Sequence, residues 1–199
     1  MYPVNLRTIT GMNAPKARKP SSGLSLMEVS IVLFIFLALI AIAIPNAMEM
    51  MKANRLTGDA RALVRQLSLA RQRAGAEFTW TQIVIDNTTT PISYNLQVCT
   101  TKATSTCTTF TTEGGTQYLS RTTLLGFGSS SGAAGGQTTR AQTSTLIFNS
   151  RGIPVDSTGS PIATDTIYLA DSAGVACAVS LTLSGHPNAW RYSGRWIQL

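Results

Sequence analysis

A single long apolar segment near the N-terminus constrains this chain more than any other feature, and one acidic residue interrupts it. The segment KPSSGLSLMEVSIVLFIFLALIAIAIP covers residues 19–45, and Glu28 is the only charged residue in it after Lys19. Its uninterrupted part, residues 29–44, has 16 residues, and the apolar residues before Glu28 extend it to the roughly 20 residues that span a bilayer. We therefore expect a helix that holds the chain in a membrane.

Glu28 lies where a charge is unfavourable. A charged side chain at membrane depth costs several kcal/mol unless it finds a partner, so an acid there is expected to be functional. If the chain is cut between Gly23 and Leu24, the new α-amino group lies about one helical turn from Glu28. A neighbouring chain that packs against this one can offer its own amine to the same carboxylate. The sequence thus predicts that Glu28 guides assembly with other subunits.

Four features at fixed offsets resemble the class III signal of type IV pilins and type II secretion pseudopilins. They are a basic leader, Gly23, an acid at the fifth position after it and Pro45 at the twenty-second; the leader cations are Arg7, Lys16, Arg18 and Lys19. The resemblance implies that a prepilin peptidase cuts between Gly23 and Leu24 and that the new amine of Leu24 is methylated. Leu24 departs from the pattern, because the family more often has Phe or Met there.

Two other kinds of N-terminal segment are alternatives. An ordinary secretory signal fits less well, because its cut follows the apolar region, whereas the recognisable cut here precedes it. A single uncleaved membrane anchor is the simpler alternative. In either case the leader has four cations and no acid, so the positive-inside rule leaves it in the cytoplasm and exports everything after Pro45 across the inner membrane.

The position of the apolar segment divides the chain into four parts. We predict a leader peptide at residues 1–23, a transmembrane and assembly helix at 24–45, an amphipathic helix at 46–75 and a β-rich domain at 76–199. The 154 residues after Pro45 are enough for one domain with its own core. Lys and Arg after Gly23 number 12 against 9 Asp and Glu, so the cleaved chain carries a formal charge of only +3.

The first exported segment has the periodicity of an amphipathic helix. Apolar residues recur at intervals of three and four, which places them on one helical face: Leu56, Ala60, Leu63, Leu67, Ala70 and Ala74. This stripe is predicted to pack on a sheet. Six cations fill much of the remaining surface: Lys52, Arg55, Arg61, Arg65, Arg71 and Arg73. A charged helical face is usually solvated, and contacts with neighbouring subunits or with an anion are the alternative.

Beyond Gly75 the sequence changes to short segments rich in β-branched and aromatic residues. We predict strands that mostly pair antiparallel, at residues 78–86, 92–98, 145–149, 166–170 and 176–183. Residues 126–136 are predicted to form a mobile loop and residues 149–161 a turn-rich crossover. The expected fold class is α+β. The resemblance to pilins implies more specifically the pilin fold, in which a long N-terminal helix packs on an antiparallel sheet domain and the first half of the helix lies in the membrane.

The C-terminal half resembles the family of pseudopilin H and FimT-type minor pilins, the GspH/FimT family. In that family an apolar strand ending in Phe leads into a polar Gly turn, then an apolar strand, then a closing strand with Gly-Arg near the terminus. The counterparts here are TLIFNSRG, TIYLAD, AVSLTLSG and YSGRW. Together with the leader, the resemblance covers most of the chain.

Three cysteines in an exported chain indicate an oxidising compartment and one unpaired thiol. Cys99 and Cys107 flank a short polar segment, so a hairpin could bring them together in a disulfide. Pairing of Cys177 with either of the others is the alternative, although Cys177 lies in an apolar segment and is expected to be buried.

The sequence favours a protein without catalytic activity. Residues 128–132 match the G-x-S-x-G pattern of hydrolases, but the residues that follow are poor helix formers and that motif requires a helix. The single histidine, His186, precedes a proline and is expected in a turn. The sequence has no paired metal-ligand spacing and no phosphate-binding loop after a strand, so we expect no enzyme, no cofactor and no metal.

The resemblance implies a minor pilin or pseudopilin, a structural subunit at the tip of a type II secretion pseudopilus or a type IV pilus. Its role would be assembly and protein secretion at the inner membrane, and its partners would be other pilins or pseudopilins and the prepilin peptidase. Both machines share the features described above, so the sequence leaves the choice between them open.

The alternative function is that of a DNA-binding minor pilin for natural transformation. Some FimT-type pilins bind DNA through a basic tail with a Gly-Arg-x-Arg motif; Gly194 and Arg195 match it, but Ile197 replaces the second Arg. Arg191, Arg195 and Trp196 combine cations with a stacking surface and are the candidate DNA-binding residues. The structural alternative is a final strand in which Trp196 packs in the core and Arg195 is solvated.

Overall fold

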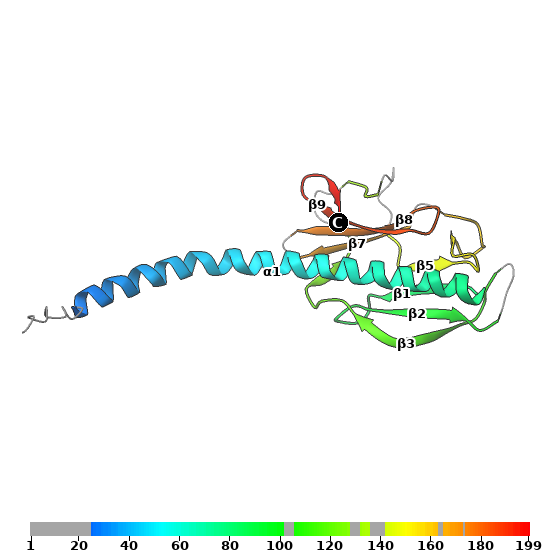
Figure 1. Cartoon of the computed structure of the whole chain (residues 1–199), viewed down its shortest axis with the longest axis horizontal. Helices are drawn as coiled ribbons and strands as arrows, with labels where there is room; N and C mark the ends of the chain where they lie inside the picture. Colours follow the sequence, from blue (N-terminus) through cyan, green and yellow to red (C-terminus); the bar gives the residue numbers. More distant parts are fainter. Residues whose placement is uncertain (1–24, 102–105, 128–131, 136–141, 163–164, 173) are drawn as a thin grey trace, which may run out of the picture. The chain divides into compact units, whose positions relative to one another are not determined.

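The computed structural model describes residues 25–101, 106–127, 132–135, 142–162, 165–172 and 174–199. The leader, Gly23 and Leu24 lie outside the described residues. Among the described residues, a single helix, α1 (Leu26–Glu77), precedes ten β-strands (Figure 1). The chain forms two compact units, Met1–Ala43 and Ile44–Leu199, and α1 contributes to both.

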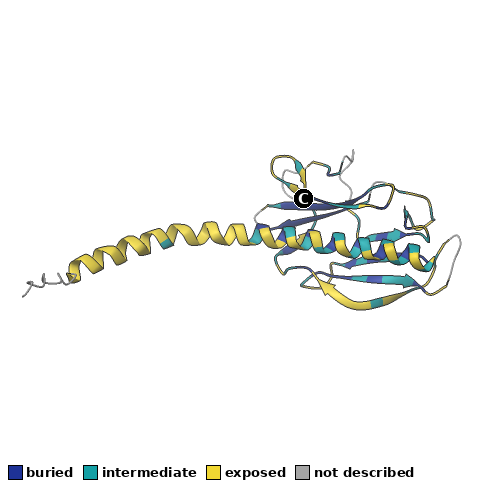
Figure 2. Ribbon diagram, viewed as in Figure 1, coloured by how far each residue is buried: buried dark blue, intermediate teal, exposed yellow. Residues whose placement is uncertain are grey.

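The N-terminal half of α1 exposes almost all of its side chains (Figure 2). Leu26 is 90% exposed and Phe34 is 75% exposed, although both are strongly apolar. By length and composition α1 could cross a membrane, and no other helix of this kind occurs among the described residues. Because apolar surface of this extent is unfavourable in water, lipid or other apolar surfaces are needed to cover it.

Helical backbone continues through Pro45. Proline lacks the amide hydrogen that would bond one turn back, so a bend or local melting is expected at this position. The expectation of local melting is wrong, because the residues on both sides of Pro45 are helical.

In the second unit α1 buries one face. Its buried residues are Ala53, Leu56, Ala60, Leu63, Leu67, Ala70 and Ala74, so the predicted stripe is confirmed and also includes Ala53. Thr81 Oγ1 donates to the carbonyl oxygen of Ala70 at 2.9 Å and fastens the helix to the first strand. Of the predicted cationic face, Arg55, Arg61 and Arg65 are exposed, whereas Lys52, Arg71 and Arg73 are half-buried.

Two antiparallel five-stranded sheets make up the rest of the described fold. In spatial order the first sheet contains β3 (Phe110–Tyr118), β2 (Ser93–Cys99), β1 (Thr81–Asp86), β5 (Thr145–Phe148) and β6 (Pro154–Val155). The second contains β10 (Trp196–Gln198), β9 (Pro187–Tyr192), β8 (Ala176–Leu181), β7 (Thr166–Asp171) and β4 (Thr123–Leu125). The predicted α+β class is confirmed.

A shared apolar core joins α1 to both sheets. Leu63 and Leu67 of α1 belong to the same buried cluster as Ile83 and Phe148 of the first sheet and Val179 of the second. Small side chains at positions 60, 70 and 74 of the helix let the strands approach its backbone closely. The helix therefore lies between the two sheets of this unit, as Figure 1 also shows.

Five of the observed strands correspond to the predicted ones: β1, β2, β5, β7 and β8. The longest strand that was missed is β3, whose sequence FTTEGGTQY shows no apolar alternation because it is an edge strand with mostly exposed side chains. The segment YSGRW was expected to be the closing strand, but its centre is the turn between β9 and β10. Gly194 has φ +73 there, and Ser193 N donates to Arg195 O at 3.0 Å.

The Gly- and Ser-rich segment 126–136 was expected to be a mobile loop, yet its described residues are anchored on the second sheet. The Phe127 ring packs on Tyr168 with centroids 4.6 Å apart, and the Ala134 amide donates to the Tyr168 hydroxyl at 3.0 Å. Trp196 Nε1 donates to the Gly132 carbonyl at 2.9 Å. The described residues thus cover the face of the second sheet that points away from α1; residues 128–131 and 136 lie outside the described residues.

A carboxylate of α1 fastens the connection between β3 and β4. The Asp59 carboxylate accepts hydrogen bonds from the backbone amide and the hydroxyl of Ser120, both at 3.0 Å, and from the Thr123 hydroxyl. Bonds to an ionised acceptor are stronger than neutral ones, so this contact holds the helix against the segment that links the two sheets.

The buried stripe can be tested with two leucines of the same helix. Leu63→Ala should lower the free energy of unfolding by about 2–5 kcal/mol, because Leu63 is fully buried and the change leaves a cavity. Leu69→Ala is the matched control, since Leu69 is 46% exposed, and should change stability by less than about 1 kcal/mol. Urea unfolding of the full chain in detergent micelles, followed by circular dichroism, measures both; equal effects would contradict the packing described above.

Candidate functional site

Glu28 lies in the first turn of α1 and is exposed. The backbone amide of Val29 donates to the Ser25 carbonyl at 3.1 Å, so the helix begins directly before the acid. A negative charge in the first turn is favourable to the helix dipole, which gives Glu28 a local role as well. Gly23 and Leu24, the residues predicted to flank the cleavage site, lie outside the described residues.

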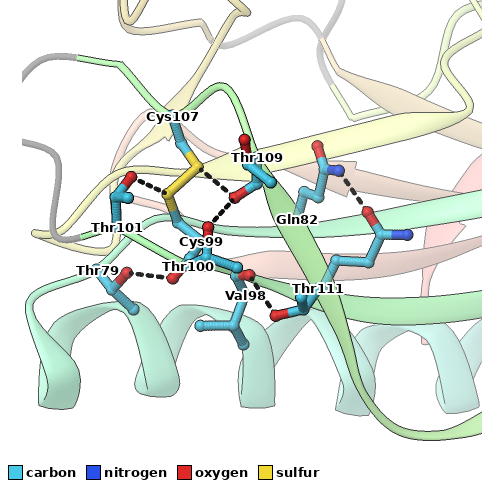
Figure 3. Close-up of a disulfide and its surroundings, with 10 residues drawn as sticks. Thr79, Gln82, Val98, Cys99, Thr100, Thr101, Cys107, Thr109 and Thr111 are labelled. Atoms are coloured by element: carbon cyan, nitrogen blue, oxygen red, sulfur yellow. Dashed lines mark hydrogen bonds between the residues drawn. A yellow bond between two sulfur atoms is a disulfide. The ribbon is translucent and has the colours of Figure 1, made fainter.

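Cys99 and Cys107 form a disulfide between the last residue of β2 and the segment directly before β3, with Cα atoms 6.1 Å apart (Figure 3). The Thr100 amide donates to the Thr109 carbonyl at 3.0 Å and continues the β2–β3 pairing beyond the bridge. The disulfide packs in a small apolar cluster with Trp80 and Val155. The disulfide thus ties the end of β2 to the start of the edge strand β3.

Cys177 is a free thiol and is fully buried. It lies on β8 in the main core, and burial raises the pKa of the thiol to about 11. Because the thiolate is the reactive form, a thiol with this pKa is almost entirely protonated at pH 8 and reacts slowly.

Thiol labelling tests both cysteine assignments at once. With iodoacetamide at pH 8 the folded full chain in micelles should take up almost no label, because Cys177 is buried and the other two sulfurs are bonded. Denaturant alone should expose one thiol, and denaturant with reductant should expose three. Mass spectrometry counts the labels; rapid labelling of the folded chain, or labelling of every cysteine without reductant, would show that these assignments are wrong.

The predicted DNA-binding residues lie on different faces of the second sheet. In the β9 register Arg191 pairs with Cys177 and Ile197, whereas Trp196 pairs with Tyr192. Directly paired residues share a face and successive residues alternate, so Arg191 lies on the face of α1 and Trp196 on the opposite face. Arg195 is exposed in the turn between β9 and β10. The structure does not bring the three side chains together on one surface.

The tail aromatics are used for packing. Tyr168 lies beneath Trp196 with ring centroids 5.8 Å apart, and Tyr192 is 5.3 Å from Trp196. Trp190 Nε1 donates to Ser180 Oγ at 2.8 Å. Since Trp196 also donates to Gly132, both indoles have their polar atom bound within the domain. The structural alternative is thus met in part: Arg195 is solvated, whereas Trp196 is half-buried against the outer face of the second sheet and lies outside the main core.

Arg191 lines a groove that sequence reasoning missed. The groove has a volume of about 580 Å³ and is bounded by Asn46, Glu49 and Met50 of α1 together with Val175. An acid and a cation thus face the same hollow from a helix and a strand that are far apart in the sequence. No periodicity connects Glu49 with Arg191, so only the packing of α1 on the second sheet could reveal their proximity.

The remaining predicted features are located as follows. His186 is exposed in the turn between β8 and β9, where its amide donates to Thr182 Oγ1 at 3.0 Å, so the prediction of a turn residue is confirmed. The hydrolase-like pattern at residues 128–132 lies mostly outside the described residues. Where the structure describes the chain, no group of three or more His, Cys, Asp or Glu residues is arranged to hold a metal.

Asp165, directly before β7, has an unusual environment. Burial raises the pKa of its carboxyl group to about 6, and the nearby charge of Asp156 adds to the effect. In the unfolded chain the carboxyl group has its ordinary pKa near 4. The folded state therefore holds the proton more tightly, so stability contributed by the protonated form is lost as pH rises from about 4 to 6.

Asp165→Asn should consequently stabilise the protein at pH 8 by roughly 1–2 kcal/mol, a figure reduced for solvent screening, and the gain should disappear below about pH 4. Asp86→Asn should instead destabilise the protein at pH 8. A hydrogen bond from Thr88 lowers the pKa of Asp86, so the ionised carboxylate stabilises the fold, and this stabilisation is lost as pH falls. Urea unfolding of the full chain across the range from about pH 3.5 to 8 checks both. A stability difference for Asp165→Asn that does not vary with pH would contradict the assignment.

No protein-family model, no curated protein and no solved structure matches this chain. The structure itself supports the coarser statement that one long N-terminal apolar helix packs on antiparallel sheets, an α+β arrangement consistent with a pilin-like fold.

Proposed function

We propose that this protein is a minor pilin or pseudopilin, a non-enzymatic structural subunit of a filament that starts at the inner membrane. The observation that carries the proposal is the difference in burial between the two halves of α1. From Leu26 to Met51 its large apolar side chains are mostly exposed, and from Ala53 onward one face is buried in the folded unit. A single helix therefore offers apolar surface to something outside the chain and forms the centre of its own domain.

The exposed half of α1 needs an apolar environment in two situations. In the membrane, lipid covers side chains such as Phe34 and Phe36. When the subunit leaves the membrane, equivalent helices of neighbouring subunits must take the place of lipid, because each large apolar side chain left in water costs about 1.5–3 kcal/mol. Packing among such helices is thus the interaction proposed to hold the filament together.

Glu28 supplies the register in this proposal. Apolar helices can slide along one another with little change in energy, whereas a carboxylate has one favourable partner, the N-terminal amine of a processed neighbour. Cleavage after Gly23 creates that amine at Leu24, close to the start of the helix. The GspH/FimT-type role at the tip of a type II secretion pseudopilus or type IV pilus rests on the sequence resemblance.

DNA uptake is the less favoured function. It rests on the tail residues, and Arg191 and Trp196 lie on opposite faces of the second sheet. A stacking site needs aromatic faces free to meet bases beside cations, yet Trp196 is packed against Tyr168 and Tyr192. The placement of these residues therefore supports a structural role for the tail.

Replacing Glu28 tests the proposed assembly role. Glu28→Leu should be inserted in the membrane and cleaved like the unmutated chain, but its cross-linking to adjacent filament subunits should fall several-fold, because the register contact is lost. Val29→Leu is the matched control and should cross-link normally, since Val29 is an apolar neighbour on the same exposed helix. Undiminished incorporation of Glu28→Leu would remove the assembly role.

Cleavage of the leader can be tested on membrane fractions of cells that express the chain. Mass spectrometry of the unmutated chain should show an N-terminus at Leu24 with a methylated amine. Replacing Gly23 by Val should leave the leader attached, because a bulky side chain hinders approach of the peptidase to the scissile bond. An intact Met1 in the unmutated chain would contradict the pilin-like interpretation, whatever the behaviour of Glu28→Leu.

A further inference from the structure

A basic cleft lies where the last turns of α1 meet two hairpin turns. Its volume is about 300 Å³, and it is lined by Ser68, Arg71 and Gln72 of α1, by Arg151 and Gly152 after β5, and by His186 after β8. These elements come from three distant regions of the sequence. The cleft shares no residue with the candidate DNA-binding tail or with the apolar segment around Glu28, so neither proposed function accounts for it.

Arg71 is held in place by two glycine turns. Gly152 and Gly185 both have positive φ, +71 and +79. A Cβ atom on Gly152 would lie 3.0 Å from Arg71 Cγ, and a Cβ on Gly185 would lie 3.1 Å from Arg71 Nε. Both glycines are therefore required for the turns to close around the arginine stem. The side chain of Arg71 therefore lies against both turns at the edge of the cleft.

The cations of the cleft have no acidic partner among the described residues. The ion pairs in that region both involve Arg73, which binds Glu77 at 2.9 Å and also Glu113. Arg71 and Arg151 form no ion pair there, although Arg71 is half-buried. Partial burial of an unpaired charge is unfavourable. A ligand with a negative charge would remove that penalty.

The helix dipole offers a simpler explanation for Arg71 alone. A cation in the last turns of a helix is stabilised by the partial negative charge of its terminal carbonyls. That effect does not explain why Arg151 and His186, which are carried by separate turns, line the same hollow. Gln72 is also exposed and adds an amide donor. Several donors around one small hollow are what a single oxyanion requires.

The size and composition of the cleft favour a carboxylate from a protein over nucleic acid. Single-stranded nucleic acid binding combines a row of cations with aromatic stacking faces, and no Trp, Tyr or Phe is among the described residues that line this cleft. The cleaved chain also has a formal charge of only +3, which gives little general attraction for DNA. We propose that this cleft binds a carboxylate side chain of an acidic segment in a partner protein, with Arg71 and Arg151 as its main ligands.

The probe for this proposal is a hexaglutamate peptide, titrated into the full chain in detergent micelles at low salt by calorimetry. Arg71→Gln and Arg151→Gln should each weaken binding about tenfold, because each removes a charge-assisted hydrogen bond. Arg55→Gln is the matched control: it changes the net charge equally on an exposed position of the same helix and should leave affinity within about twofold. Arg71→Lys should weaken binding several-fold, because the ammonium lacks the two-pronged geometry of the guanidinium.

Inorganic phosphate and a six-nucleotide single-stranded DNA are the competing probes. We expect both to bind more weakly than the peptide. Tighter binding of either one that is lost in Arg151→Gln would overturn the proposal, as would equal losses in Arg55→Gln or no detectable peptide binding. Because Arg151 is exposed, its variant should fold normally even if Arg71→Gln loosens the turns around Gly152 and Gly185. These outcomes do not depend on filament assembly, so they are independent of the proposed function.

Discussion

Burial of one helical stripe between two sheets is the interaction on which the folded unit depends. Each sheet has only one face directed at α1, and neither could bury that face without the helix. Leu56, Leu63 and Leu67 supply the apolar volume, and the alanines between them keep the backbone of the helix near the strands. Loss of this stripe would expose both inner sheet faces together, so the helix and the sheets are expected to unfold cooperatively.

The second sheet is covered more completely than the first. Tyr168, Ala178 and Ala134 form a small cluster on its outer face, so β7 and β8 are buried on both sides. The outer face of the first sheet has a small apolar cluster around Trp80 and Val155, and beside it polar residues that include the hydrogen-bonded pair Gln82 and Gln97 at 2.6 Å. Its edge strand β3 is rich in Thr and Gly and is closed at one end by the disulfide. The two sheets therefore differ in how much surface they can offer to a partner.

Local patterns in the sequence predicted the elements that depend on local periodicity. The roughly 3.6-residue spacing of the helical stripe and the β-branched content of β1, β2, β5, β7 and β8 were sufficient for these elements. Strand β3 could not be found this way, because an edge strand with an exposed face has no apolar alternation to detect. The contacts of Phe127 and Ala134 in the Gly- and Ser-rich segment 126–136 could not be predicted for a related reason: both residues pack on Tyr168, which is more than thirty positions away.

Sites formed between elements were outside the reach of sequence patterns. The cleft around Arg71 and the groove around Arg191 each combine a turn of α1 with residues that follow it by about eighty positions or more. Turn glycines such as Gly152 were visible in the sequence, but the identity of the side chain that they accommodate depends on tertiary packing. The proposals of cleavage after Gly23 and of assembly through Glu28 rest on the N-terminal sequence pattern.

The alternation along β9 has a consequence for how this protein can change. Arg191 lines the groove beside α1, whereas its neighbours Trp190 and Tyr192 pack with the aromatic residues on the opposite face of the sheet. Substitutions at adjacent positions can thus alter one surface and leave the other intact, so the two surfaces can evolve separately. Insertion or deletion of a single residue in β9 would exchange the two sets, placing an indole against the helix and a guanidinium under the aromatic cluster. Such length changes should be far less tolerated in this strand than substitutions.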